Sequence, residues 1–148
     1  MITAKEFMTI DERIAQLPKR HKIVVVDDDE DHYMLLRIGI RSVLKEFDIM
    51  YVGDSQKFLD EFIGGKIDCE IMFIDTNMPK IEGYDLCSRI REVQGDRFIR
   101  IYGMSGCTVD FDHYVQKWAD AKPDGFYKKE DLHQRKSDVL KRIFSETL

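Results

Sequence analysis

The first buried segment of the chain reads IVVVDDD (residues 23–29), an unbroken β-branched run that ends abruptly in acid. A continuous apolar run, unlike one that alternates with polar residues, is typical of a strand covered by helices on both faces. Four more apolar runs follow along the chain, at 49–52, 71–74, 98–104 and 125–127. The sequence therefore predicts five short strands buried within one sheet.

Segments with the apolar spacing of a helix separate these runs. They are predicted over residues 32–46, 55–63, 84–93, 111–120 and 131–146. Strands that alternate with helices form parallel sheets through right-handed crossovers. We therefore expect an α/β fold of five strand–helix units in a single domain that spans residues 21–148.

A further helix is predicted before the first strand, within residues 1–20. Its apolar side chains share one helical face, and they are Phe7, Ile10, Ile14 and Leu17. Thr9 and Glu12 have the spacing of a capping box, and Pro18 closes the segment. We interpret this amphipathic helix as an extension that packs on the domain, with a homodimer contact or a partner-docking surface as the alternatives.

Composition places the chain among globular proteins. Its 148 residues are 43% hydrophobic and 34% charged, a balance that favours a packed core over disorder. The formal net charge of −5 gives no general attraction to nucleic acid or to anionic lipid, so neither is expected as a partner. The three cysteines lack disulfide or metal spacing, and no apolar stretch resembles a signal peptide or a membrane span. We therefore predict a cytoplasmic protein.

Reactive side chains follow the predicted strands at the points where the strands end. The first strand ends at Asp27 and Asp28, the third at Asp75 and the fourth at Ser105, while the fifth leads to Lys129. Ligands of an open parallel sheet bind at this edge. Clustered carboxylates without nearby histidine or cysteine favour Mg²⁺, and a carboxylate beside Mg²⁺ can attack phosphorus to form an acyl phosphate. The pattern therefore predicts metal-assisted phosphoryl chemistry.

The order and spacing of these residues resemble the receiver domain of two-component response regulators. The likeness covers roughly residues 21–147 and is carried by Val24-Val25-Val26-Asp27-Asp28, Ile74-Asp75, Met78-Pro79, Gly83, Ser105, Gly125-Phe126 and Lys129. It implies a flavodoxin-like, doubly wound sheet with strand order 2-1-3-4-5. It also implies a single-domain form like the chemotaxis regulators, because too few residues lie outside the domain for a DNA-binding or enzymatic output domain.

The resemblance implies which residues hold the metal. Asp75 would accept the phosphoryl group, and Asp27, Asp28, Asp75 and the backbone carbonyl of Asn77 would bind Mg²⁺. The acidic run leaves open whether Asp29 also approaches the metal, although an acid after a strand is a common helix N-cap.

The resemblance also implies which residues bind and regulate the phosphoryl group. Ser105 and Lys129 would bind its oxygens. Phe126 would be the aromatic residue whose rotamer follows the movement of Ser105. Asn77 and Cys107 would tune the lifetime of the phosphoryl group.

The function that follows from the resemblance is that of a stand-alone receiver. Its donor would be a phosphohistidine on a sensor histidine kinase or on a histidine phosphotransfer protein. It would signal by phosphorylation-dependent contact, through the face of the fourth helix, fifth strand and fifth helix, or by phosphorelay. It would not be an enzyme beyond its own Mg²⁺-dependent phosphorylation and dephosphorylation. Trp118 is a candidate contact on that face if it is exposed, although core packing is its commoner role.

Two alternatives remain open. A pseudo-receiver would keep the fold as a binding module without being phosphorylated, and Glu130 in place of the family's usual proline favours it slightly. A haloacid-dehalogenase-type phosphatase would use the acids at 27–29 and the motif at 104–106. It would need a further acidic pair on a strand after Lys129, and it leaves Asp75 without a role. The four histidines show no ligand spacing, so no site role is predicted for them.

Overall fold

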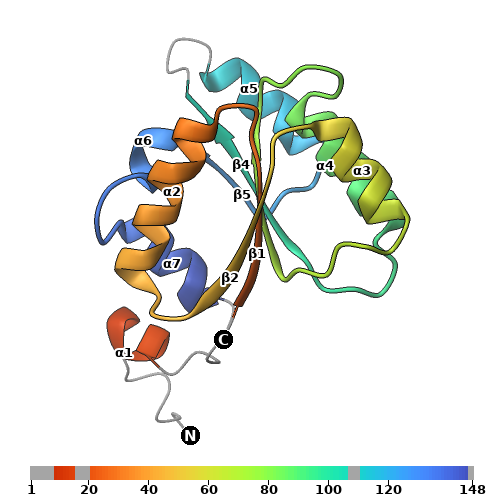
Figure 1. Ribbon diagram of the computed structural model, residues 1–148. Coiled ribbons are helices and arrows are strands. Elements are labelled where there is room, and N and C mark those ends of the chain that lie inside the picture. The colour runs from red at the N-terminus through yellow and green to blue at the C-terminus, as the bar shows by residue number, and fades with distance from the viewer. Residues whose placement is uncertain (1–8, 16–20, 107–110, 147–148) are drawn as a thin grey trace, which may run out of the picture.

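The computed structural model describes residues 9–15, 21–106 and 111–146. Its centre is a parallel sheet of five strands in the order β2-β1-β3-β4-β5 (Figure 1). The strands are β1 (His21–Val26), β2 (Phe47–Val52), β3 (Ile71–Asp75), β4 (Arg100–Ser105) and β5 (Gly125–Lys128). This strand order and the parallel register confirm the predicted flavodoxin-like fold.

Helices cover both faces of the sheet (Figure 1). They are α1 (Ile10–Ala15), α2 (Glu30–Val43), α3 (Ser55–Ile63), α4 (Gly83–Val93), α5 (Phe111–Ala119), α6 (Lys129–Leu132) and α7 (Asp138–Glu146). Helices α2, α6 and α7 lie on one side of the sheet, and α3, α4 and α5 lie on the other. The sheet is therefore the middle of three layers.

Alternating side chains of the central strands fill two cores, one on each face of the sheet. In β1, Ile23 and Val25 pack with residues of α2 and α7, whereas Val24 and Val26 pack with residues of α3 and α4. Successive residues of a strand point to opposite faces, so a strand that is covered on both faces must be apolar throughout. This explains the unbroken β-branched run that precedes the acids.

The C-terminal segment differs from the predicted single helix over residues 131–146. It forms two helices, α6 and α7, with a break between them. Lys136 has a φ of 53°, in the left-handed region, and Ser137 Oγ accepts a hydrogen bond from the Leu140 N–H at 3.2 Å. A left-handed residue followed by a capping serine ends one helix and begins the next. The apolar spacing continues across the break, which is why the prediction was wrong.

Several other element boundaries differ from the prediction by a few residues, among them the starts of β4 and α2. Strand β4 begins at Arg100 rather than at residue 98, and Phe98 is 77% exposed. Helix α2 begins at residue 30 rather than 32, because the Asp29 side chain accepts a hydrogen bond from the Asp31 N–H at 3.0 Å. Asp29 is therefore the N-cap of α2, the role that acids after strands commonly take.

The predicted N-terminal helix is present as α1, and it lies against α7 below the sheet in Figure 1. Thr9 Oγ1 accepts a hydrogen bond from the Glu12 N–H at 3.1 Å, one of the two bonds of the predicted capping box. Lys141 Nζ forms an ion pair with Asp11 Oδ1 at 3.3 Å. Both ends of the predicted apolar face fall outside the described residues. The domain division at residue 20 and the homodimer contact stay predictions.

Candidate functional site

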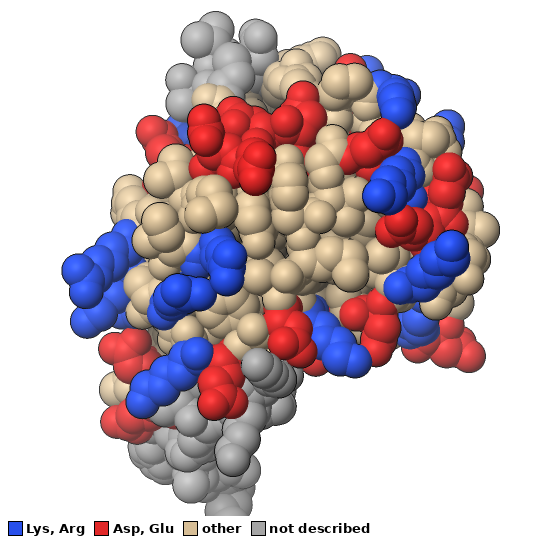
Figure 2. All heavy atoms as spheres, viewed as in Figure 1, with Lys and Arg blue, Asp and Glu red and all other residues tan. Residues whose placement is uncertain are grey.

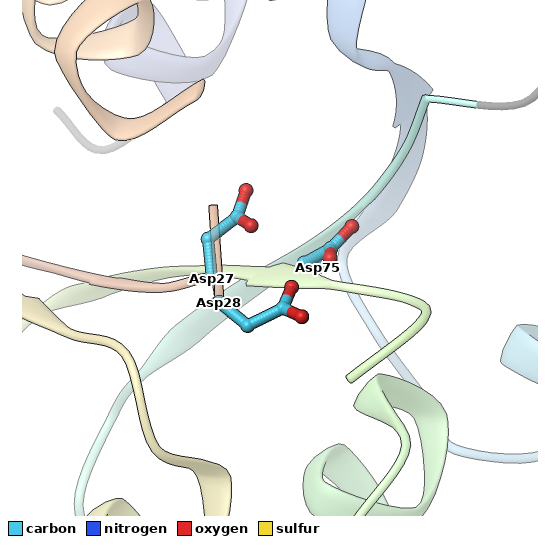
Figure 3. A group of neighbouring side chains, drawn as sticks. All are labelled: Asp27, Asp28 and Asp75. Atoms are coloured by element: carbon cyan, nitrogen blue, oxygen red, sulfur yellow. The ribbon is translucent and has the colours of Figure 1, made fainter. Parts of the chain in front are cut away.

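The ends of β1 and β3 bring three carboxylates together. Asp27 and Asp28 follow β1 directly, Asp75 is the last residue of β3, and the two strands are neighbours in the sheet. One carboxylate oxygen from each residue lies within 4.8 Å of the others, and Figure 3 shows the three side chains gathered at the strand ends. Figure 2 shows acidic side chains concentrated on the surface above the start of α2. The topology thus joins residues from two separate strands into one acidic cluster.

Lys129 supplies positive charge to this cluster. It is the first residue of α6 and is buried, with Nζ 2.8 Å from Asp27 Oδ2 and 3.1 Å from Asp75 Oδ1. Asp27 is 0% exposed, and its Oδ1 accepts a hydrogen bond from the Asp29 N–H at 2.9 Å. The ammonium contacts two of the three carboxylates, and one positive charge against three acids leaves a net negative charge that a divalent cation would neutralise.

The pKa of the Asp75 carboxyl is raised from 3.8 to about 7. Burial is the main cause, since the residue is 6% exposed, and the charge of Asp27 adds to it. The charge and hydrogen bond of Lys129 oppose the shift without cancelling it. A buried carboxyl among other acids binds either a proton or a cation, and the all-oxygen donor set fits Mg²⁺.

Hydrogen bonds hold the backbone directly after Asp75. The N–H and Oγ1 of Thr76 both donate to the Met104 carbonyl, at 3.0 and 2.6 Å. The Thr76 carbonyl in turn accepts from the Gly83 N–H at 2.8 Å. The loop between β3 and α4 is therefore tied to β4 on one side and to the helix start on the other, which fixes the direction of the Asp75 side chain.

The two residues that were predicted to tune the phosphoryl lifetime have different outcomes. Asn77 is exposed in the loop after β3, and its Oδ1 accepts a hydrogen bond from the Tyr114 hydroxyl at 3.1 Å. Cys107 lies outside the described residues. Their roles stay predictions, as does that of the Asn77 carbonyl as a metal ligand.

Ser105 ends β4 beside the acidic cluster. It is buried and pairs in register with Lys128 of β5. Together with Gly106 and Lys129 it lines a cavity of about 220 Å³. A hydroxyl and an ammonium group at the wall of one cavity suit an anionic ligand.

Trp118 is a core residue rather than the exposed contact considered from the sequence, since it is only 1% exposed. Its Nε1 donates to Thr76 Oγ1 at 3.0 Å, and its ring packs so closely on Gly103 that an added Cβ would lie 2.7 Å from it. The Phe126 ring lies between the rings of Trp118 and Phe111, with centroid separations of 5.7 and 4.8 Å. Phe126, the aromatic residue predicted to follow the movement of Ser105, therefore belongs to a stack of rings that begins beside the acidic cluster. Its change of rotamer stays a prediction.

His32 is a site residue that the sequence did not reveal. Its Nδ1 forms a hydrogen bond with Lys129 Nζ and lies 3.5 Å from Asp29 Oδ2 and 3.9 Å from Asp27 Oδ2. It belongs to the first turn of α2, three residues after the N-cap Asp29. Residues three apart lie on the same side of a helix, and this spacing is the one sequence signal that places His32 near the acids.

Fold and site together define a doubly wound α/β domain with an acidic cluster at the strand ends. The family model of the response regulator receiver domain matches residues 23–136. The chain therefore belongs to the receiver domain family, the phosphoacceptor class of two-component signalling, as its motifs indicated.

Two curated relatives are longer proteins. The 3′,5′-cyclic-nucleotide phosphodiesterase regA of Dictyostelium discoideum is 29% identical over 98 residues, which cover 65% of this chain and 12% of regA. The probable transcriptional regulator ycf27 of Cyanidium caldarium is 24% identical over 135 residues, which cover 86% of this chain and 49% of ycf27. The chain thus spans less than half the length of each.

Among solved structures, the response regulator TrrA of Thermotoga maritima, in complex with Mg²⁺-BeF, is similar to this chain. The TM-score is 0.67 at 21% sequence identity, and the match covers 86% of this chain and 99% of TrrA. At this identity the likeness establishes the fold.

Proposed function

We propose that Asp75 accepts a phosphoryl group in a Mg²⁺-dependent reaction. The observation that carries this proposal is the position of its carboxylate, 3.1 Å from Lys129 Nζ and clustered with those of Asp27 and Asp28. An oxygen of Asp75 would form a bond to phosphorus while the bond from phosphorus to the donor breaks, and the electron pair of that bond leaves with the donor. Lys129 and Ser105, which line one cavity, would bind the phosphoryl oxygens.

The carboxylates of Asp27, Asp28 and Asp75 would hold Mg²⁺, with the Asn77 carbonyl as a further ligand. When bound, the ion neutralises charge on the carboxylates and on the incoming phosphoryl oxygens. Support comes from the acidic cluster itself and from TrrA, whose fold this chain shares and which was solved with Mg²⁺-BeF.

The donor would be a phosphohistidine on a sensor histidine kinase or a histidine phosphotransfer protein. Three apolar side chains of α2 are exposed beside the site, namely Met34, Leu35 and Ile38. Leu35 also lines the cavity that contains Lys129. A protein donor that covers this apolar surface would deliver its phosphoryl group next to that lysine.

The phosphorylated protein would signal by contact through α5, β5 and α7, or pass the group on by phosphorelay. Phe126 of β5 stacks on Trp118, which is hydrogen-bonded to Thr76 next to Asp75. This contiguous set of side chains is the route by which the state of Asp75 would reach that face.

Several finer expectations accompany this proposal. The protein would dephosphorylate itself but have no other enzymatic activity, and it would act as a stand-alone receiver in the cytoplasm. Among the described residues, no helix combines the length and the apolar character that crossing a membrane requires. Nucleic acid and membranes are not expected as partners.

Incubation with acetyl phosphate and Mg²⁺ tests the proposal. Intact-mass measurement should show one phosphoryl group on the wild-type protein, none on Asp75→Asn, and none on the wild type in EDTA. An amide cannot form the acyl phosphate, and the acidic cluster needs its cation. Asp60→Asn is the matched control, because Asp60 is an exposed acid of α3 that should not affect the reaction.

Peptide mapping of the modified residue separates the alternatives. A wild-type protein that stays unmodified would support the pseudo-receiver. Modification of Asp27 instead of Asp75 would support the phosphatase alternative, although the described residues after Lys129 form helices rather than the acidic strand that it needs.

Mg²⁺ binding should depend on pH, because the ion competes with a proton for Asp75. With a pKa of about 7 for that carboxyl, the apparent affinity should rise up to pH 7 and level off above it. Binding should be roughly tenfold weaker at pH 6 than at pH 8. Isothermal titration calorimetry at the two values measures the ratio, and Asp60→Asn should show the same ratio. An affinity that is equal at pH 6 and pH 8 would contradict a raised pKa.

A further inference from the structure

His32 makes a third contact with the buried ammonium group of Lys129, beside the ion pairs with two carboxylates. A lysine ammonium has three N–H donors and no acceptor. Lys129 Nζ contacts three acceptors, which are Asp27 Oδ2 at 2.8 Å, Asp75 Oδ1 at 3.1 Å and His32 Nδ1. Two carboxylates and one imidazole therefore surround the ammonium group, which is oriented by three contacts instead of two.

This contact also assigns the tautomer of His32. Because the ammonium can only donate, Nδ1 accepts, and the ring proton lies on Nε2. The carboxylates of Asp29 and Asp27 lie 3.5 and 3.9 Å from the same nitrogen, too far for good hydrogen bonds. Lys129 is thus the hydrogen-bond partner of the imidazole.

His32 lies at the wall of the cavity rather than in a core. Its side chain is 34% exposed, and it lines the cavity together with Ser105 and Lys129. A Cβ added at Gly106 would lie 3.8 Å from His32 Cε1 and 3.6 Å from Lys129 Cδ, so Gly106 borders both side chains at ordinary van der Waals distance. A partly exposed imidazole contributes little to packing. Besides its hydrogen bond with Lys129, the ring contacts that of His133, with a centroid separation of 5.7 Å.

We propose that His32 is a positioning residue for the phosphorylation of Asp75, an inference that rests on the proposed function. His32 would hold the Lys129 ammonium toward the cavity, where the ammonium would contact the incoming phosphoryl oxygens. When phosphorus bonds to Asp75, a phosphoryl oxygen replaces the carboxylate as one acceptor of Lys129, and the bond to His32 persists. Without His32, only the two carboxylates orient the ammonium, and the transfer slows.

The phosphorylation rate with acetyl phosphate at saturating Mg²⁺ tests this role. His32→Leu has a side chain of similar size without an acceptor, and it should react about tenfold more slowly. His32→Asn keeps an acceptor at the same number of bonds from the backbone, and it should regain most of the rate. Both variants should bind Mg²⁺ as the wild type does, because Lys129 is not a metal ligand. His113→Leu, at an exposed position of α5, is the matched control.

A double-mutant cycle tests whether His32 affects the phosphorylation rate through Lys129. In a Lys129→Ala background, His32→Leu should cause no further loss of rate. The role of His32 is overturned if His32→Leu reacts at the wild-type rate, if His32→Asn is as slow as His32→Leu, or if the loss persists without Lys129. A wild-type protein that is never modified would instead overturn the proposed function, and the role of His32 with it.

Discussion

Replacing Gly83 with alanine is expected to lower the free energy of unfolding by about 3 kcal/mol or more. A Cβ at this position would lie 1.9 Å from the backbone carbonyl oxygen of Asp75 and 3.0 Å from Cζ2 of Trp118. The first of these atoms belongs to the backbone and cannot rotate away. The higher helix propensity of alanine would return about 1 kcal/mol at most, so the clash decides the sign. Urea denaturation provides the measurement.

The same substitution should also disturb the site. The Gly83 N–H donates to the Thr76 carbonyl at 2.8 Å, so α4 cannot move away without losing the bond that holds the loop. The clash is therefore relieved by moving the Asp75 carbonyl, which displaces its carboxylate and slows phosphorylation.

Gly106→Ala is the matched control for Gly83→Ala. A Cβ at Gly106 meets its nearest atoms at 3.6 and 3.8 Å, which is ordinary van der Waals contact. Its stability should change by less than about 1 kcal/mol. If Gly83→Ala and Gly106→Ala were equally stable, the close approach of α4 to the end of β3 would be contradicted.

The second large effect is expected for Asp75→Asn, which should stabilise the Mg²⁺-free protein at pH 8 by up to about 4 kcal/mol. Burial, with the charge of Asp27, raises the pKa of this carboxyl in the folded protein from 3.8 to about 7. Keeping it ionised therefore costs free energy that the unfolded chain does not bear, and an amide of the same shape removes the cost. The melting temperature in EDTA should rise by several degrees.

The difference in stability between the wild-type protein and Asp75→Asn should grow as the pH rises. The folded state binds the Asp75 proton more tightly than the unfolded state does. The stabilisation from that proton is therefore complete below pH 3.8 and is lost as the pH rises toward about 7. Melting temperatures of wild type and Asp75→Asn should diverge over this range and converge below it. Added Mg²⁺ should raise the wild-type value and so reduce the difference.

Asp28→Asn is the control for this effect, because Asp28 is exposed and its charge contributes least to the shift of Asp75. It should stabilise the Mg²⁺-free protein by less than Asp75→Asn does. The reverse order would show that repulsion within the cluster, and not burial, dominates the cost of ionising Asp75.

The acidic cluster was predictable because its members follow strand ends. The β-branched run before Asp27 and Asp28 marks β1, and the apolar run before Asp75 marks β3. Once the strands are parallel and ordered 2-1-3-4-5, their carboxyl ends must lie at one edge, and Lys129 after β5 reaches the same edge. The proximity of these residues therefore follows from the topology, while their roles are proposals.

Other features could not be predicted from the chain alone. Helical spacing placed Trp118 on an amphipathic helix but could not show that Gly103 of β4 makes room for its ring. The contact between His32 and Lys129 joins residues 97 positions apart, and neither has a local pattern that indicates the other. The break between α6 and α7 depends on the left-handed φ of Lys136.

Local patterns in the amino-acid sequence thus specified the strands, most of the helices, the strand order through the family likeness, and the acids and lysine at the sheet edge. Each of these depends on residues that are close in the chain or on the rule that parallel strands end together. Packing in three dimensions specified the burial of Trp118, the raised pKa of Asp75 and the hydrogen bond between His32 and Lys129. These depend on the distances between side chains from separate elements, and such distances exist only after the helices have packed on the sheet.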